Sequence, residues 1–272
     1  MRLSQLGELG LLAELERRGL ISGVEHDAAD IGGGLVVTQD TLVEGVHFRL
    51  DWLSWRELGF RAAAVNISDL AASAAEPDAL VVTLAAPGSV EADDVYCFYE
   101  GIAEAGVRVA GGDTTASPLV VVTVTAIGRS ERIPGRAGAR PGDLLVVTGP
   151  LGAAGAAFRS GGYVRPPIRI EEGKRLGAAA HAMLDVSDGI AVDAGHLGRR
   201  SGVRCVIDLE AVPLASGAEI ADLGFGEDYE LLAAVADPGE LTVIGRVETG
   251  EGFELRLHGE PHELRGWEHF LP

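Results

Sequence analysis

Carboxylates recur along this chain in short motifs that also carry glycine, serine or threonine. They are Thr38-Gln39-Asp40-Thr41, Asn66-Ile67-Ser68-Asp69, Gly111-Gly112-Asp113-Thr114-Thr115, Asp185-Val186-Ser187-Asp188-Gly189 and Gly226-Glu227-Asp228-Tyr229-Glu230. We expect these motifs at strand edges and tight turns. Mg²⁺ prefers hard oxygen ligands and completes its octahedron with water and substrate phosphate. The motifs therefore predict a magnesium-dependent enzyme that handles phosphate.

The motif around Asp185 combines two kinds of candidate. An apolar strand is expected to run into Asp185, and a helix is expected to begin just after Asp188. Ser187 or Asp188 is an ordinary candidate for the cap of that helix. The same helix N-terminus would also favour a bound phosphate. Asp185 has no capping role at the end of a strand, so it is the better candidate for a metal ligand.

The Gly-Gly-Asp motif has both a functional and a structural interpretation. Two glycines let the backbone approach a bulky ligand closely, and Asp113 could then hold a metal beside it. A plain turn is the alternative, because Gly-Gly-Asp is common in loops. Asp27, Asp40 and Asp69 also permit structural interpretations when each is taken alone. Their joint appearance carries the prediction of a metal site.

The sequence lacks the common lysine-based devices for binding phosphate. It has no Gly-x-x-x-x-Gly-Lys-Ser/Thr loop, and Lys174 is its only lysine. Two like charges ~4 Å apart repel by about 4 kcal/mol at an effective dielectric of ~20, so unpaired carboxylates would repel a nucleotide. Metal ions and a few arginines must then neutralise the phosphate charge.

The composition is that of a globular protein with a strong negative charge. The 272 residues are 47% hydrophobic and 23% charged, with a formal net charge of −19. That charge argues against nucleic acid or an anionic membrane as a partner, although solubility or salt adaptation explains most of it. Cys97 and Cys205 are expected to be buried small residues. With no signal-peptide pattern and no apolar run of ~20 residues, we expect a cytoplasmic protein.

The periodicity of apolar residues alternates between helical and strand patterns, which predicts an α+β fold of α/β layers. Helices are predicted at 6–18, 55–75, 90–105, from 151, at 168–182 and at 190–200. Strands are predicted at 35–38 with a continuation over 43–48, and at 79–85, 119–127, 144–148, into 185, 203–209, 229–235, 241–247 and 253–257. Residues 135–142 have the composition of a connection. We therefore expect two domains, 1–138 and 139–272.

The motifs quoted above, in the same order along nearly the whole chain, resemble those of the thiamine-monophosphate kinase family. The resemblance includes the longer runs Thr38–Phe48 and Ala64–Ala72. It implies the fold of the aminoimidazole-ribonucleotide-synthetase-like superfamily. In that fold an N-terminal sheet with helices makes the metal, ATP and dimer contacts, and a C-terminal α/β domain completes the active-site cleft. It also implies transfer of the γ-phosphate of ATP to thiamine monophosphate with several Mg²⁺ ions, in a homodimer.

The resemblance also assigns roles to individual residues. Metal ligands are implied at Asp27, Thr38, Gln39, Asp40, Asp69, Asp113, Asp185 and Asp188. ATP contacts are implied at Gly112, Asp113, Arg136, Ser187 and Tyr99, and thiamine monophosphate contacts at His47, Glu227 and Trp267. Asp113, Asp185 and Arg136 are the implied catalytic residues. Trp267 could offer its flat face to a ring, or it could be a packing anchor near the C-terminus. Arg136 could instead belong only to the connection.

The sequence departs from the family pattern at three places. Glu25-His26-Asp27 stands where the family has two aspartates, so His26 replaces the first of them. Gln39 stands where threonine is common, and Phe225-Gly226 replaces a glycine pair. Two other functions stay open: another enzyme of the same superfamily, such as selenophosphate synthetase or aminoimidazole-ribonucleotide synthetase, and a sensor of thiamine phosphate or nucleotide without catalytic activity.

Overall fold

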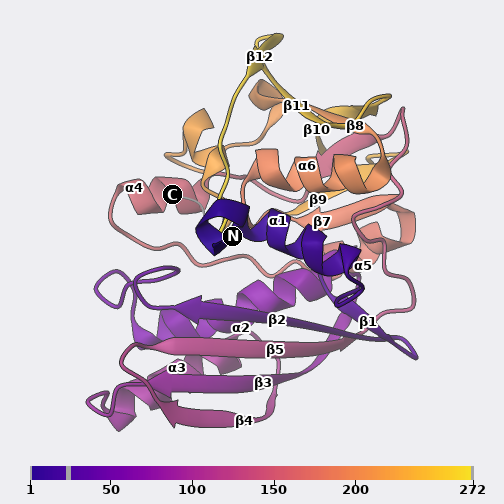
Figure 1. The fold of residues 1–272 in the computed structure, drawn as a ribbon. Helices are drawn as coiled ribbons and strands as arrows, with labels where there is room; N and C mark the ends of the chain where they lie inside the picture. The colour runs from indigo at the N-terminus through magenta and orange to yellow at the C-terminus, as the bar shows by residue number, and fades with distance from the viewer. Residues whose placement is uncertain (1, 23–25, 271–272) are drawn as a thin grey trace.

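The computed structural model describes residues 2–22 and 26–270, and its helices and strands form two sheets with helices packed on them (Figure 1). Glu25 lies outside the described residues. The helices are α1 (Leu3–Arg17), α2 (Trp55–Ala72), α3 (Ala92–Glu104), α4 (Ala153–Arg159), α5 (Ile170–Ala179) and α6 (Ile190–Ser201). The strands are β1 (Ala29–Gly32), β2 (Leu35–Val43), β3 (Glu76–Ala86), β4 (Val109–Ala116), β5 (Val121–Arg129), β6 (Leu144–Val147), β7 (Ala182–Asp185), β8 (Arg204–Asp208), β9 (Leu231–Val235), β10 (Thr242–Glu248), β11 (Gly252–Leu257) and β12 (Glu260–His262). The predicted α+β class is confirmed.

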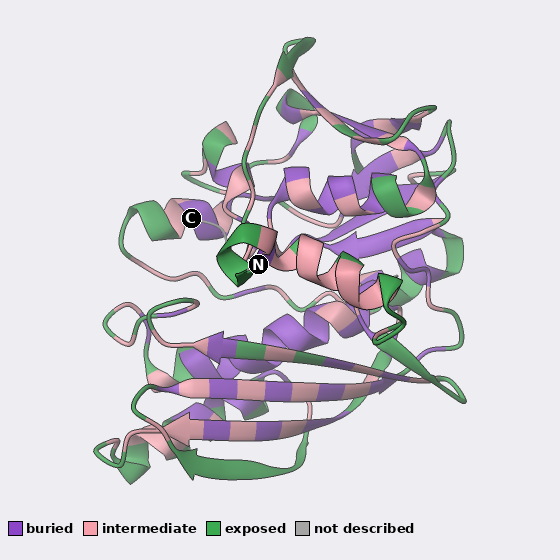
Figure 2. Ribbon diagram, viewed as in Figure 1, coloured by how far each residue is buried: buried purple, intermediate pink, exposed green. Residues whose placement is uncertain are grey.

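The five-stranded sheet has the order β1-β2-β5-β3-β4. All its neighbours are antiparallel except β3 and β4, which are parallel. Helices α2 and α3 cover one face of this sheet. On the other face the residues of β2, β5 and β3 are partly exposed, so these strands alternate between buried and intermediate positions, while β4 is exposed throughout (Figure 2).

Helix α2 is the central element of the fold. Its N-terminus carries a capping box: the Glu57 amide donates to Ser54 Oγ, and the Ser54 amide donates to the Glu57 carboxylate. The alanine-rich sequence that follows has high helix propensity and small side chains. Almost every residue from Leu58 to Ala72 is buried, because both sheets and α3 pack around the helix.

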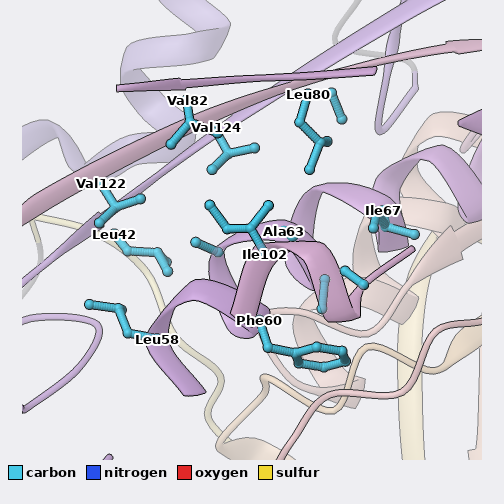
Figure 3. Packing of buried hydrophobic residues seen from close by; sticks show 14 of the residues in the cluster. Leu42, Leu58, Phe60, Ala63, Ile67, Leu80, Val82, Ile102, Val122 and Val124 are labelled. Carbon is cyan, nitrogen blue, oxygen red and sulfur yellow. The ribbon is translucent and has the colours of Figure 1, made fainter. Parts of the chain in front are cut away.

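The N-terminal core lies between α2 and the sheet (Figure 3). Figure 3 shows Leu58, Phe60, Ala63 and Ile67 of α2 beside side chains of the strands and of α3. The strand and α3 residues labelled there are Leu42, Leu80, Val82, Val122, Val124 and Ile102. The inward residues of each strand follow a period of two, as a sheet with one covered face requires.

The seven-stranded sheet has the order β12-β11-β8-β10-β6-β9-β7, and only its β8–β11 pair is parallel. Helix α6 packs on one face through Ile190, Ala194 and Leu197. On the other face Met183 of β7 packs in one cluster with Leu176 of α5 and with the C-terminal alanines of α2. The last turn of α2 therefore joins the two sheets.

Further contacts also connect the two halves of the chain. Lys174 Nζ of α5 lies 2.6 Å from the Glu76 carboxylate at the start of β3. Helix α1 lies beside α6, where Glu16 pairs with Arg200 at 3.2 Å. The N-terminal helix thus contacts the C-terminal half, and the expected division at residue 138 stays a prediction.

Three of the acidic motifs do not lie at the strand edges or turns that we expected. Asp40 is inside strand β2, Asp69 is inside helix α2, and Asp113 is inside strand β4; Asp185 alone of these four ends a strand. The strands β1, β4 and β12 were not predicted, and β2 ends at Val43 instead of continuing to Phe48. Over residues 2–22 and 26–270, no helix has both the length and the hydropathy to cross a membrane.

Candidate active site

Three carboxylates from distant parts of the chain meet where α2 joins the two sheets. Asp27 precedes β1, Asp69 lies in α2 and Asp185 ends β7. One oxygen of each lies within 4.8 Å of the others. Like charges at this spacing repel one another, so the arrangement requires a compensating cation or retained protons. We call Asp27, Asp69 and Asp185 the acidic cluster.

Hydroxyl groups fix the orientation of two carboxylates in the cluster. The Thr38 hydroxyl donates to Asp69 Oδ2 at 2.5 Å, and the Ser68 hydroxyl donates to Asp185 Oδ2 at 2.5 Å. The second bond connects α2 to the end of β7, so it also joins the two halves of the chain. The sequence analysis assigned no role to Ser68, although its motif was recognised.

Asp40 lies beside the cluster on the covered face of β2. Its backbone amide donates to Asn66 Oδ1 at 3.0 Å, and the Asn66 amide group donates in turn to the Ala62 carbonyl at 3.0 Å. Asn66 is fully buried, and no role was assigned to it from the sequence. A buried asparagine or serine in an alanine-rich helix is the signal that could have identified both residues.

The carboxylates near the cluster hold protons more tightly than usual. Burial raises the pKa of Asp185 to about 8 and that of Asp40 to about 6, and Asp27 adds to both shifts. Burial, together with Asp40 and Asp185, raises the pKa of Asp69 well above its ordinary value. Bringing Asp69 and Asp185 into the ionised form at neutral pH therefore requires added positive charge.

Arg136 supplies part of that charge. Its Nε and Nη2 atoms donate to Asp27 Oδ1 at 2.9 and 2.6 Å, and the Asp27 side chain is only 2% exposed. Asp27 Oδ2 is buried and has no hydrogen-bond partner among the described residues. An unsatisfied buried carboxylate oxygen facing two further carboxylates is the donor set that a divalent cation requires. Mg²⁺ fits this site.

The chain on the C-terminal side of the cluster brings four more predicted residues together. The Glu227 amide donates to the Ser187 carbonyl at 2.8 Å, and the Trp267 amide donates to the Asp188 carbonyl at 2.9 Å. The Asp188 amide donates to Asp193 Oδ2 at 3.2 Å, which makes Asp193 a buried support that the sequence analysis missed. Burial raises the pKa of Asp188 to about 6.

The predicted substrate residues lie at the end of the site away from Asp27. His47 Nδ1 accepts a bond from the Val43 amide at 3.0 Å, and the His47 ring lies 5.2 Å from that of His269. Burial, and then the charges of His269 and Arg61, lower the pKa of His47 to about 4. Trp267 is 49% exposed and meets His269 edge to face at 5.7 Å. An aromatic surface of Trp267 and His269 therefore borders His47.

Known proteins are similar to this chain over nearly its whole length. The family model "AIR synthase related protein, N-terminal domain" matches residues 25–130. The thiamine-monophosphate kinase of Aquifex aeolicus is 33% identical over 99% of this chain and 100% of its own length, and that of Mycobacterium tuberculosis H37Rv is 34% identical over 98% and 93%. This chain belongs to the thiamine-monophosphate kinase family.

Solved structures agree with this family assignment. The fold matches the structure titled "AaThiL complexed with AMPPCP and TMP" with a TM-score of 0.90 and 33% identity, over 99% of each chain. The hydrogenase maturation protein HypE in the HypE–HypF complex matches with a TM-score of 0.78 and 18% identity, over 94% of this chain and 99% of that chain, so it shares the fold alone.

Several residues that the family resemblance implies do not join the acidic cluster within one chain. The Thr125 hydroxyl donates to Gln39 Oε1 at 2.8 Å, on the face of the sheet that α2 does not cover. Tyr99 of α3 is half-buried and packs against the N-terminal core, with its ring 5.3 Å from that of Phe98. The Gln39 side chain and Tyr99 therefore keep their metal and ATP roles only as predictions.

Asp113 and Gly112 also lie away from the cluster. Strand β4 is an edge strand, and Asp113 is in register with Thr83, Thr123 and Thr41 across the sheet. That row lies on the uncovered face, and Asp113 at its end is three strands, roughly 14 Å, from β2. The expectation that Asp113 binds metal beside Asp40 is not met within a single chain.

Arg61 is a residue of the site that the sequence analysis did not identify. It lies in α2, is 6% exposed, and forms an ion pair with Glu227 from the C-terminal half. An arginine directly before the alanine run of α2 was its only signal in the sequence, because its partner is 166 residues away.

Proposed function

We propose that this chain phosphorylates thiamine monophosphate to thiamine diphosphate with ATP, and that Mg²⁺ bound at the acidic cluster is required. The observation that carries the proposal is the meeting of Asp27, Asp69 and Asp185 in a fold that matches thiamine-monophosphate kinases over nearly its whole length. The family match supports the ATP-dependent kinase activity. The donor set of the cluster supports the metal.

The metal proposal assigns ligands by position. Asp27, Asp69 and Asp185 would bind directly, while Asp40 and Thr38 lie beside them on the covered face of β2. Asp188 is a candidate for a further ion because it lies just beyond the end of β7. Bound Mg²⁺ would neutralise phosphate charge and let two anionic substrates approach each other.

The remaining residues would orient the substrates. The acceptor oxygen belongs to a phosphate monoester whose second pKa is about 6, so it is largely ionised at neutral pH and needs no strong general base. Direct in-line transfer then depends on alignment, with no phosphoenzyme. Ser187 lies just before α6, where helix amides favour a phosphate, and Arg136 can form charge-assisted bonds to a phosphoryl group.

We also propose a homodimer formed through the uncovered face of the five-stranded sheet. That face carries the half-buried apolar side chains of Leu35, Val37, Val81, Val121 and Ile127. Apolar residues on a continuous sheet face favour burial against another surface. Asp113 and the Gln39 side chain lie on the same face, so a dimer would let Asp113 of one subunit complete the site of the other. Light scattering tests the dimer, and a monomer at assay concentration would contradict it.

An assay of the purified protein tests the activity. With ATP and Mg²⁺, we expect thiamine monophosphate to yield thiamine diphosphate and ADP in equal amounts. Parallel reactions with free thiamine and without acceptor measure selectivity and background hydrolysis. Asp185→Asn is the matched negative control. Binding of both substrates without ADP release over hours would instead support the sensor function. We place the reaction in the cytoplasm, which cell fractionation tests.

A further inference from the structure

Helix α2 carries polar side chains toward both ends of the site. Ser68 and Asp69 lie at the acidic cluster, and Arg61 lies about two turns closer to the N-terminus of the helix. Residues 61, 65, 68 and 69 fall on one face of an α-helix. Eight residues at 1.5 Å each separate Arg61 from Asp69 by about 12 Å along the axis. One rigid element thus fixes the distance between the cluster and Arg61.

Arg61 is buried at a cost that its surroundings offset only in part. Its guanidinium pairs with Glu227 and lies 5.7 Å from the centre of the Tyr163 ring. Arg61 Nε and the Tyr163 hydroxyl are both buried without a hydrogen-bond partner among the residues that the structure describes. A desolvated guanidinium is stable only when acceptors surround it. The ion pair with Glu227 thus meets only part of the hydrogen-bonding capacity of Arg61.

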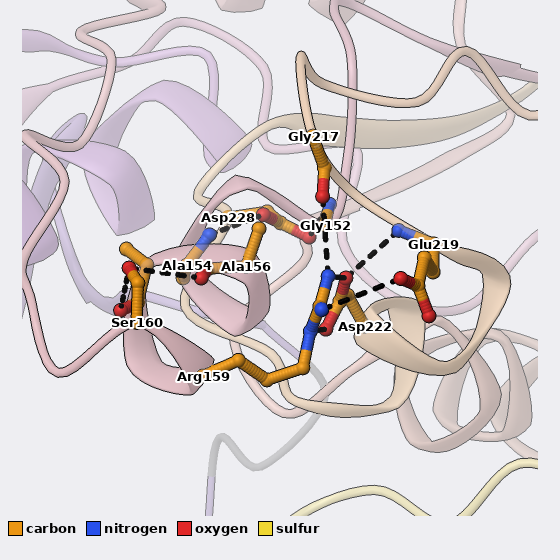
Figure 4. Close-up of polar contacts among 10 residues, drawn as sticks. Gly152, Ala154, Ala156, Arg159, Ser160, Gly217, Glu219, Asp222 and Asp228 are labelled. Carbon is orange, nitrogen blue, oxygen red and sulfur yellow. Dashed lines mark hydrogen bonds and ion pairs between the residues drawn. The ribbon is translucent and has the colours of Figure 1, made fainter.

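Glu227 is the only acid of its segment that faces Arg61. Asp228 accepts bonds from the Gly152 amide at 2.8 Å and the Ala154 amide at 3.5 Å, at the start of α4 (Figure 4). Glu230 accepts bonds from Arg169 at 2.6 and 2.7 Å. Glu227 lies directly before these anchored residues and has a left-handed conformation, with φ of 61°. The backbone is thus held so that the Glu227 side chain points toward Arg61 of α2.

The Glu227 carboxylate still has capacity to bind a ligand. Arg61 contacts its Oε1 atom, and the side chain stays 26% exposed. Glu227 also lines a cavity of about 220 Å³ with Arg165 and Pro166. An ionised carboxylate accepts several hydrogen bonds, so Oε2 is free to accept one from the ring of a substrate. Burial raises the pKa of Glu227, and Arg61 acts against that shift.

We propose that Arg61 is a positioning residue that holds Glu227 at a fixed distance from the acidic cluster, so that Glu227 binds the hydrogen-bond-donating ring of the acceptor whose phosphate lies at the cluster. This inference depends on the proposed function. The ion pair then selects acceptor molecules by the distance between their phosphate and their ring, and by the presence of a hydrogen-bond donor on that ring. A salt bridge that only stabilises the fold would have no such selectivity.

Substitution of Arg61 tests the inference. We expect Arg61→Gln to raise the KM and the Kd for thiamine monophosphate about 10- to 100-fold, because Glu227 loses its orientation and its charge partner. The KM for ATP should change less than about twofold, since ATP does not contact Glu227. Arg61→Lys keeps the charge without the planar fork and should give an intermediate KM. Steady-state kinetics and calorimetry without ATP provide the two measurements.

The control and a double variant separate positioning from stability. Arg56 lies on the same helix but pairs with Glu100 and Glu104 of α3, so Arg56→Gln should leave both KM values unchanged. In a Glu227→Gln background, Arg61→Gln should add little further loss. Equal increases in both KM values, or additive losses in the double variant, would overturn the inference.

Misfolding of Arg61→Gln and inactivity of the wild-type protein are the two remaining outcomes. Should Arg61→Gln fail to fold, Arg61→Lys decides, and a wild-type KM for thiamine monophosphate in that variant overturns the inference. Wild-type protein that binds thiamine monophosphate but forms no ADP contradicts the proposed function alone, because the Kd comparison still tests Arg61.

Discussion

The hydroxyl of Ser68 in α2 donates to Asp185 Oδ2 at the end of β7, at 2.5 Å. This bond connects a helix of one half of the chain to a strand of the other. It also lies inside the acidic cluster, so it favours the ionised form of a carboxylate whose pKa burial raises. One hydroxyl thus contributes both to the junction and to the charge of the site.

Replacing Ser68 should weaken metal binding. Ser68→Ala removes a bond to a charged acceptor, worth about 1–2 kcal/mol, and should raise the Mg²⁺ concentration for half-maximal activity about tenfold. Saturating Mg²⁺ should restore most of the rate. Ser130→Ala is the control, because the buried Ser130 hydroxyl donates to the Ala74 and Arg132 carbonyls away from the cluster. An unchanged Mg²⁺ dependence in Ser68→Ala would contradict the assigned role.

Without metal, the protein should lose stability as pH rises from about 6.5 to 8. The folded state holds the Asp185 proton up to about pH 8, whereas an unfolded aspartate loses it near its ordinary value of 3.8. The unfolded state therefore binds fewer protons in this window, and the free energy of unfolding falls with rising pH. His47 and His196 have lowered pKa values and act in the opposite direction, but only below about 6.5.

Thermal unfolding with excess chelator measures this dependence. Mg²⁺ should raise the unfolding temperature more at pH 8 than at pH 6.5, because it replaces protons that the carboxylates must release. Asp185→Asn should flatten the pH dependence between these values. A metal-free protein that becomes more stable toward pH 8 would show that the cluster does not hold protons as inferred.

A mixing experiment tests whether Asp113 acts across a dimer. Asp113→Asn and Asp185→Asn should each be inactive alone. If the two residues of one site come from different subunits, a mixed dimer contains one doubly altered site and one intact site. Random exchange of subunits in a twofold dimer then restores about a quarter of the wild-type rate. No recovery after confirmed subunit exchange would contradict a role of Asp113 in the site of the other subunit.

Two adjacent glycines should respond differently to alanine. A Cβ atom on Gly112 would collide with the Val82 carbonyl of the neighbouring strand, whereas one on Gly111 would meet nothing within 4 Å. Gly112→Ala should therefore cost about 1–3 kcal/mol of unfolding free energy through displaced strand pairing. Gly111→Ala should change it by less than about 0.5 kcal/mol. Urea unfolding compares them, and equal stability of the two variants would contradict the close approach of β3 and β4.

The sequence predicted those features that depend on local pattern. The alternation of strands and helices in the C-terminal half was predicted correctly because buried strands and amphipathic helices have distinct periods. Asp185 was placed at a strand end for the same reason. The alanine-rich pattern over 55–75 predicted a helix that contains Asp69, so its placement at a strand edge was wrong even by local criteria.

Features that depend on distant contacts could not be predicted in this way. Gly111-Gly112-Asp113 has the composition of a turn, but pairing with β3 makes it a strand. Arg61 and Glu227 are 166 residues apart, and no periodicity connects them. The family resemblance implied a functional role for Asp113 without indicating that its side chain faces away from Asp40.

The pairing of Lys174 with Glu76 offers a practical probe. Because the sequence contains one lysine, an amine-reactive dye can label only that side chain and the chain terminus. Lys174 is half-exposed on α5 and lies against the first residue of β3, at the boundary between the two layers. Fluorescence from this single position can therefore report, in real time and without engineered cysteines, whether the surroundings of this boundary change when nucleotide is added.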